Sequence, residues 1–165
     1  MENQPEQIGG FMEDVTGEQV HFGPGFAITV SASQDANVDR AGALAISANG
    51  NANVMYGGAL AISIGHNLEQ QYGGAGIMNI GRDVDITNGG AWIMNAGRNV
   101  TVTNGGVGVA ISAQSRIENG TVGILLSSET HLGEGTRVIL NTPQAAALGA
   151  AAGAVFALLR WLLKK

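Results

Sequence analysis

Apolar and polar positions along this chain repeat with a period of sixteen residues. The three clearest copies begin at Gly57, Gly73 and Gly89 and read GGALAISIGHNLEQQY, GGAGIMNIGRDVDITN and GGAWIMNAGRNVTVTN. Weaker copies precede them, and the period shortens to fifteen after Gly105. A short fixed period is typical of a solenoid, in which each repeat buries its apolar side only against its neighbours.

Each copy contains two strand-like runs separated by glycine-rich turns. The runs are five or six residues long and rich in Ile, Val, Ala and Thr, which favours strands over helices. The turns include Asn88-Gly89 and Asn104-Gly105, dipeptides that readily supply positive φ. The sequence therefore predicts an all-β fold, a parallel β-solenoid with about 16 residues per coil, two short strands per coil and seven to eight coils.

The second strand of each copy alternates as a half-buried strand should. Val84 and Ile86 are predicted to point inward, and Asp83 and Asp85 to point outward. We call residues at the same position of successive coils a column. One outward column is polar and is expected to form a ladder of side chains: Asp35, Asn51, Asn67, Asp83 and Asn99.

The first strand does not alternate, because both of its parities are apolar. One parity includes Met78 and Trp92, and the other includes Ile77 and Ile93. Successive side chains on a strand point to opposite faces, so one apolar set must lie outside the solenoid. We expect the Leu/Ile/Met/Trp set to be internal, because Trp92 stands in its column between two glycines and close packing favours such pairs of large and small residues. A narrow core that takes the Ala/Ser set is the alternative.

An outward apolar set would form on the order of 500 Å² of contiguous surface, at or above the largest patch usual for a soluble monomer. One interpretation is an alanine-rich face that stays exposed without a partner, and this interpretation suits the early coils. It does not suit the later coils, where larger side chains occupy this parity. We therefore predict an assembly interface there, comprising Ile77, Ile93, Val107, Val109, Ile111, Val122, Ile124 and Leu126.

The chain divides into four segments. Residues 1–18 are an acidic N-terminal tail or cap, 19–141 are the β-solenoid domain, and 142–144 are a linker that contains Pro143. Residues 145–165 begin with an apolar run whose length, about 28 Å as a helix, is sufficient to cross a bilayer core. We predict that they form a C-terminal hydrophobic α-helix that is transmembrane or membrane-associated.

Two kinds of residue support membrane insertion of this segment. Gly149 and Gly153 form a small-xxx-small pattern that lets helices approach closely in lipid. Four residues are expected at the membrane interface: Arg160, Trp161, Lys164 and Lys165. The alternative is a helix that folds back along the apolar sheet face. The terminal lysines favour a cytoplasmic C-terminus and the polar N-terminus favours a cytoplasmic solenoid, so the side of the membrane stays open.

Composition narrows the classes of function. The net charge is −5 with 13% charged residues and no basic stripe, which argues against a nucleic-acid partner. The absence of cysteine excludes disulfides and thiolate metal sites. The three histidines, His21, His66 and His131, fall in different columns. The glycines of the chain recur at the coil period rather than in a phosphate-binding motif. No cofactor, metal or catalytic residue is therefore predicted.

A cysteine-free β-solenoid with short terminal extensions and a membrane-targeting element resembles the bactofilins, bacterial polymer-forming cytoskeletal proteins. The resemblance covers the repeat region only and implies end-to-end polymerisation through exposed terminal rungs. The strict sixteen-residue period, the glycine pairs and the C-terminal position of the membrane segment depart from that family. The resemblance assigns no functional residue.

These observations predict a non-enzymatic structural or assembly protein held at a membrane by a single C-terminal anchor. Its expected partners are membrane lipid and either a second copy of the chain, giving a homo-oligomer, or a larger membrane complex. The alternative is a ligand- or surface-binding module that uses the Asp/Asn/Thr face of the second sheet, including Asn99, Thr101 and Thr103.

Overall fold

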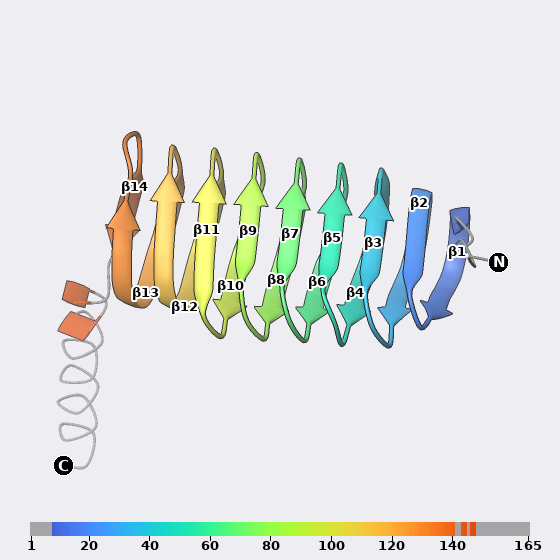
Figure 1. The fold of residues 1–165 in the computed structure, drawn as a ribbon. Helices are drawn as coiled ribbons and strands as arrows, with labels where there is room; N and C mark the ends of the chain where they lie inside the picture. The colour runs from blue at the N-terminus through green and yellow to red at the C-terminus, as the bar shows by residue number, and fades with distance from the viewer. Residues whose placement is uncertain (1–7, 141–142, 145, 148–165) are drawn as a thin grey trace, which may run out of the picture.

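The computed structural model describes residues 8–140, 143–144 and 146–147. These residues form a straight rod of parallel strands, with β1 at one end and β14 at the other (Figure 1). The rod is a parallel β-solenoid of about 8 turns with about 16 residues per turn, which confirms the predicted architecture.

The strands follow one another in chain order along the rod. Their bounds are β1 Ile8–Gly17, β2 Val20–Ala32, β3 Ala36–Asp39, β4 Ala41–Ala48, β5 Ala52–Met55, β6 Gly58–Ile64, β7 Leu68–Gln71, β8 Gly74–Ile80, β9 Val84–Thr87, β10 Gly90–Ala96, β11 Asn99–Thr103, β12 Gly106–Glu118, β13 Thr121–Leu132 and β14 Arg137–Leu140.

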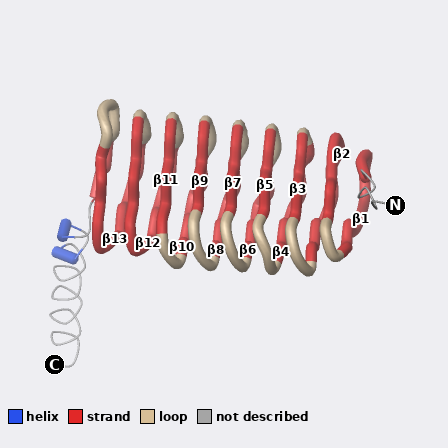
Figure 2. The backbone as a smooth tube through the Cα atoms, viewed as in Figure 1, coloured by secondary structure: helices blue, strands red, loops and turns tan. Residues whose placement is uncertain are grey.

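Two parallel sheets form the two long sides of the rod. The first sheet has the order β10-β8-β6-β4-β2, and β12, β13 and β14 extend it beyond β10. The second has the order β3-β5-β7-β9-β11-β12. The long strands β2, β12 and β13 bend across the rod and belong to both sides, whereas short loops separate the strands of the middle coils (Figure 2).

The register repeats the period of the sequence. Val38 pairs with Val54, and Met78 pairs with Met94, each sixteen residues further along the chain. Like residues therefore stack on like residues. The core contains a column of large apolar side chains from the first sheet, Ile46, Ile62, Met78, Met94 and Leu125, each nearly inaccessible to solvent.

The corner after most of the second strands combines a left-handed residue with a glycine that follows it, and after β3 the residue that follows Arg40 is Ala41. At six corners the left-handed residue is not a glycine: φ lies between 48° and 55° at Arg40, Tyr56, Tyr72, Asn88, Asn104 and Asn119, whereas at the last corner Gly135 has φ of 68°. The glycine that follows has another function, because a Cβ on Gly73 would lie 1.8 Å from the Gly57 carbonyl oxygen of the preceding coil. The glycine column thus permits close approach of stacked turns, while Asn, Tyr and Arg carry the positive φ.

The solenoid begins earlier than residue 19. β1 pairs in parallel with β2, and Val15 is buried opposite Val30. Residues 8–17 therefore form a rung of the rod rather than a separate tail.

The predicted C-terminal helix is not supported by the described part of the chain. Residues 143–144 and 146–147 have helical backbone, and the rest of 145–165 lies outside the described residues.

Candidate assembly surface

The first strand of each coil bends in its middle, so that two neighbouring side chains both face outward. In β10, Ala91 and Met94 are buried, whereas Trp92 and Ile93 between them are exposed. The pairing with β12 skips the same place: Ala91 pairs with Val107 and Ile93 with Val109, with no pairing recorded for Trp92. The rod therefore has a corner here.

The predicted parity is wrong for half of each first strand. Met78 and Met94 lie inside as expected, but Leu60 of the same parity is 65% exposed and Trp92 is 80% exposed. Strict alternation would have placed Trp92 with Met94, and the bend between them reverses which parity faces the core.

The same bend divides the residues of the predicted interface. Val107 and Val122, at 3% and 0% exposure, precede the bend and pack in the core, so they cannot contact a partner. The remaining six lie after the bend on the outside. Ile77, Ile93 and Ile111 are exposed, and Val109, Ile124 and Leu126 are half-buried.

We define the assembly surface as the two neighbouring outward columns at this corner. The ridge column comprises Ile28, Leu44, Leu60, Gly76, Trp92, Gly108, Gly123 and Ile139. The flank column comprises Thr29, Ala45, Ala61, Ile77, Ile93, Val109 and Ile124. From β2 to β14 neither column contains a charged residue, and Thr29 carries the only side-chain hydroxyl in them. On β1, Glu13 and Asp14 continue the two columns, and Asp14 accepts a hydrogen bond from Thr29 Oγ1. The sequence pattern did not predict that Leu60 and Trp92 face outward, although both are unusually large among neighbouring glycines and alanines.

The outer face of the second sheet is polar, as predicted. Its ladder is continuous through Asn51, whose Nδ2 donates to Asp35 Oδ1 at 3.3 Å, and Asn67, whose Nδ2 donates to Asn51 Oδ1 at 3.1 Å. At the far end, Asn99 Nδ2 donates to Asp83 Oδ1 at 2.8 Å. In each of these three pairs, the side-chain oxygen of one ladder residue accepts a hydrogen bond from the side-chain amide of the residue one coil further on.

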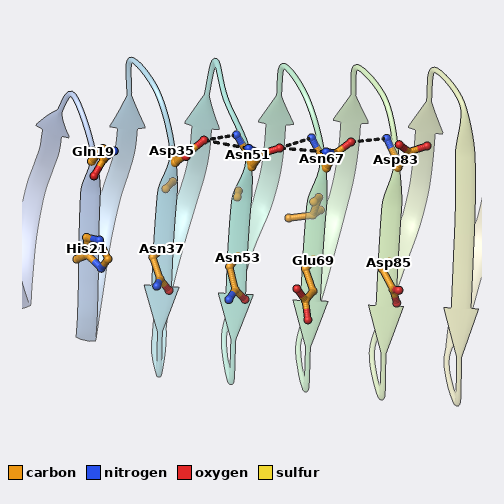
Figure 3. Close-up of a pocket in the computed structure, with 13 residues that line it drawn as sticks. Gln19, His21, Asp35, Asn37, Asn51, Asn53, Asn67, Glu69, Asp83 and Asp85 are labelled. Atoms are coloured by element: carbon orange, nitrogen blue, oxygen red, sulfur yellow. Dashed lines mark hydrogen bonds between the residues drawn. The ribbon is translucent and has the colours of Figure 1, made fainter.

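A groove of about 680 Å³ runs beside this ladder. One wall is the ladder and the other is the parallel column of His21, Asn37, Asn53, Glu69 and Asp85 (Figure 3). No lysine or arginine lines it. The groove ends at Asp83 and Asp85, so it does not reach Asn99, Thr101 or Thr103.

The pKa of Asp85, in the second wall of the groove, is raised by its surroundings. Partial burial of Asp85, and secondarily the negative charge of Glu69 on the next coil, raise the pKa of Asp85 above its ordinary value. Glu69 also accepts a hydrogen bond of 2.7 Å from Gln71 Nε2. The groove therefore concentrates negative charge at one end.

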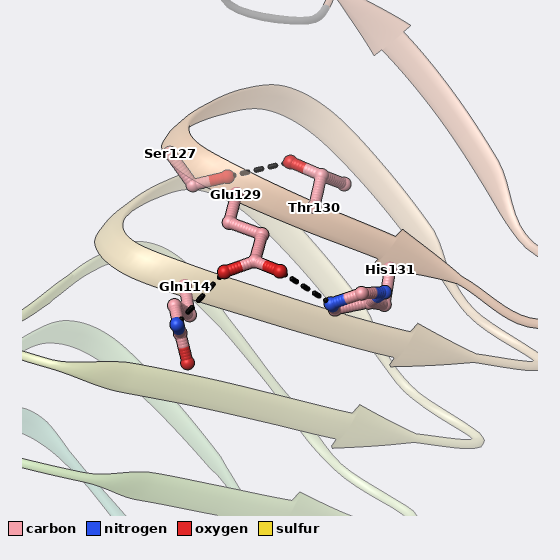
Figure 4. A network of polar contacts seen from close by, with 5 residues as sticks. All are labelled: Gln114, Ser127, Glu129, Thr130 and His131. Atoms are coloured by element: carbon pink, nitrogen blue, oxygen red, sulfur yellow. Dashed lines mark hydrogen bonds and ion pairs between the residues drawn. The ribbon is translucent and has the colours of Figure 1, made fainter.

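A second polar cluster lies near the C-terminal end of the rod. Glu129 accepts a hydrogen bond from Gln114 Nε2 at 2.8 Å and contacts His131 Nε2 at 3.0 Å (Figure 4). All three side chains are exposed. In the part of the chain that the structure describes, no cluster of three His, Asp or Glu residues is arranged to hold a metal ion.

The predicted membrane residues Gly149, Gly153, Arg160, Trp161, Lys164 and Lys165 lie outside the described residues. Over residues 8–140, 143–144 and 146–147, no helix has the length and apolar character needed to span a bilayer.

Comparison with known proteins yields no matching family model, and no curated protein or solved structure is significantly similar to this chain. The solenoid architecture is thus established by the coordinates, and nothing links the chain to the bactofilins specifically.

Proposed function

We propose that this chain is a non-enzymatic structural protein whose solenoid is held at a membrane by residues 145–165 and associates through the assembly surface. The observation that carries the proposal is the outward exposure of large apolar side chains on one corner, with Leu60, Ile77 and Trp92 each more than half exposed. Such side chains are costly to leave in water when they form a contiguous patch.

The shape of the solenoid supports an assembly role over a chemical one. Its side chains repeat from coil to coil, and a repeated column presents the same group at intervals of about 4.8 Å along the rod. An extended surface of this kind suits contact with another extended surface. The partner is a second copy of the chain or a subunit of a larger membrane complex.

Charge on the assembly surface tests the association. Ile93→Asp should dissociate the complex, because burying a carboxylate against an apolar partner without a counter-charge is strongly unfavourable. Thr101→Asp is the matched control, since Thr101 lies on the opposite, polar side. The mass of the full chain in mild detergent, measured by light scattering, should fall for the first variant only. An unchanged mass for Ile93→Asp refutes the proposal.

Membrane attachment has a separate test. Val155→Asp with Leu159→Asp introduces two charges into the apolar run of residues 145–163. The variant should no longer float with phospholipid vesicles, while Lys165→Asp, which changes a residue beyond the run, should still float. Flotation of the double variant would remove membrane anchoring from the proposal.

The groove favours a second candidate function, a binding module for cationic ligands. Its lining includes four carboxylates, Asp35, Glu69, Asp83 and Asp85, and no lysine or arginine. Calorimetry with spermidine as the probe tests it: Glu69→Gln with Asp85→Asn should abolish the binding heat without changing the mass of the assembly. Retained binding in that variant would exclude the groove.

A further inference from the structure

The ridge column carries projections toward β2 and hollows toward β13, and Trp92 stands between two of the hollows. Leu60 and Trp92 project, whereas Gly76 between them and Gly108 beyond them leave the backbone bare. A groove of about 620 Å³ occupies this part of the surface and is lined by these four residues together with neighbouring alanines and glycines. Leu60 and Trp92 are two coils apart, about 10 Å, and Ile28 and Leu44 also project from the two coils before Leu60.

The chain cannot fill these hollows with larger side chains of its own. A Cβ on Gly76 would lie 2.6 Å from the Leu60 carbonyl oxygen, and one on Gly108 would lie 2.5 Å from that of Trp92. Gly123 is constrained in the same way, at 2.5 Å from the Gly108 carbonyl oxygen. The hollows are therefore a fixed property of the backbone at this corner.

We propose that the partner of the assembly surface is the same surface of a second copy, with the two rods antiparallel. The inference rests on the proposed function and specifies its partner and register. The two-fold axis lies between the two surfaces, parallel to the strands and midway between the coils of Gly76 and Trp92. This operation places three projections against hollows of the second copy, Trp92 on Gly76, Leu60 on Gly108 and Leu44 on Gly123, and it leaves Ile28 opposite Ile139 at the two ends of the interface.

Other arrangements of two rods fit less well. A parallel pair related by a two-fold axis along the rods places Trp92 against Trp92 and Leu60 against Leu60. A parallel pair shifted by one coil fits Trp92 into a hollow but places Leu44 against Leu60, and it is heterologous, so it leaves unpaired surface and does not close. The antiparallel pair closes, and every contact in it occurs twice.

The flank column is compatible with this arrangement. Ile77 lies opposite Ile93 of the second copy, and no charge is desolvated, because neither column contains a charged residue from β2 to β14 and no described coil lies opposite Glu13 and Asp14 of β1. The buried area is on the order of 500 Å² per copy, or about 1,000 Å² in total, which is the lower limit for a specific interface. The dimer is therefore expected to depend on concentration.

Cysteine cross-linking in the full chain determines the register, because the native sequence has no cysteine. Ala45→Cys and Ile124→Cys are outward flank positions that face each other only in the antiparallel pair. The probe is a bis-maleimide with a reach of about 10 Å, the usual distance between packed sheets. A mixture of the two single variants should give cross-linked dimer, and Ala45→Cys alone should not, since its two copies lie five coils or about 24 Å apart.

Tryptophan provides a second measurement. In a Trp161→Phe background Trp92 is the only tryptophan, and its fluorescence should shift to the blue and resist acrylamide quenching as dimer forms. In the native background, Trp92→Ala should weaken dimerisation by roughly thirtyfold, the effect typical of a buried aromatic hot spot.

The outcomes separate the two proposals. Cross-linking of Ala45→Cys alone, or no cross-linking while Ile93→Asp still dissociates the assembly, overturns the antiparallel pair and keeps the proposed function. A monomer in which Trp92 is nevertheless shielded from acrylamide assigns the surface to another segment of the same chain and overturns the inference. A monomer with freely quenched Trp92 refutes both.

Discussion

The rings of Tyr56 and Tyr72 stack with their centroids 4.9 Å apart and their planes 4° apart. Both residues occupy the left-handed corner of successive coils, with φ of 51° and 52°. Bulky residues are disfavoured in this conformation, and asparagine is tolerated there. The later coils place Asn88 and Asn104 at the same corner.

This corner predicts an order of tolerance at position 72. Tyr72→Asn should change the free energy of unfolding little, because the loss of the ring stack, about 1 kcal/mol, is offset by easier adoption of positive φ. Tyr72→Val should be less stable than Tyr72→Asn by about 1 to 2 kcal/mol, because a β-branched residue is strained there. Urea unfolding followed by circular dichroism measures both. Equal stability of the two variants would contradict a conformational role for this column.

Neighbouring glycines provide a matched pair of substitutions. A Cβ on Gly73 would lie 1.8 Å from a backbone oxygen, whereas the nearest atom to a Cβ on Gly74 is 3.7 Å away. Gly73→Ala should therefore destabilise the fold by about 3 kcal/mol. Gly74→Ala should be neutral or stabilising by about 0.5 kcal/mol, because alanine restricts the unfolded chain. Similar unfolding midpoints for the two variants would show that stacked turns separate easily.

Gln70 is a polar residue in an apolar column of the core. Its side chain is fully buried, and neither amide atom has a hydrogen-bond partner. The column continues with Ile86 on the next coil. Gln70→Leu should raise the free energy of unfolding by about 1 to 3 kcal/mol, since it removes the desolvation cost of an unpaired amide. Gln71→Leu, at a half-buried position on the same strand, is the control, and its effect should be smaller. A loss of stability in Gln70→Leu would show that the amide is satisfied in solution.

The pKa of Asp85 predicts a dependence of stability on pH. Because its pKa is raised in the fold, mainly by burial and then by the charge of Glu69, the folded state holds the proton more tightly than the unfolded state. The stabilisation is present below the ordinary pKa of an aspartate and is lost as pH rises through the folded value. Asp85→Asn should therefore raise the urea midpoint at pH 7 and leave it unchanged at pH 3. The gain should stay below about 1 kcal/mol, because Asp85 is largely solvent-exposed and its charge is screened.

Glu69→Gln separates the two causes of this shift. It removes the repulsion and keeps the burial, so the pKa of Asp85, followed by NMR, should fall part of the way toward its ordinary value. A complete return would show that charge rather than burial is the larger cause.

Sequence periodicity was sufficient for the architecture and for one of the two sheets. The second strand alternates in the sequence, and Val84 and Ile86 are buried in the fold as alternation requires. The polar ladder followed from the same rule, because residues sixteen apart stack when every coil has the same length. The structural role of the glycine columns could not be predicted in this way. Asn88 has the positive φ, whereas a Cβ on Gly89 would lie 2.3 Å from the Gly73 carbonyl oxygen.

The sequence by itself determined the coil, its length and its direction of stacking, because a repeat of sixteen residues with two strand-like runs can bury its apolar side only against its own copies. Only the tertiary structure decided which first-strand residues face outward. Alternation is a rule for a flat strand, and the corner that closes each coil places Trp92 and Ile93 outward together while Val107 turns inward. That corner is set by how each coil closes on itself, so no single strand's pattern of apolar residues reveals it.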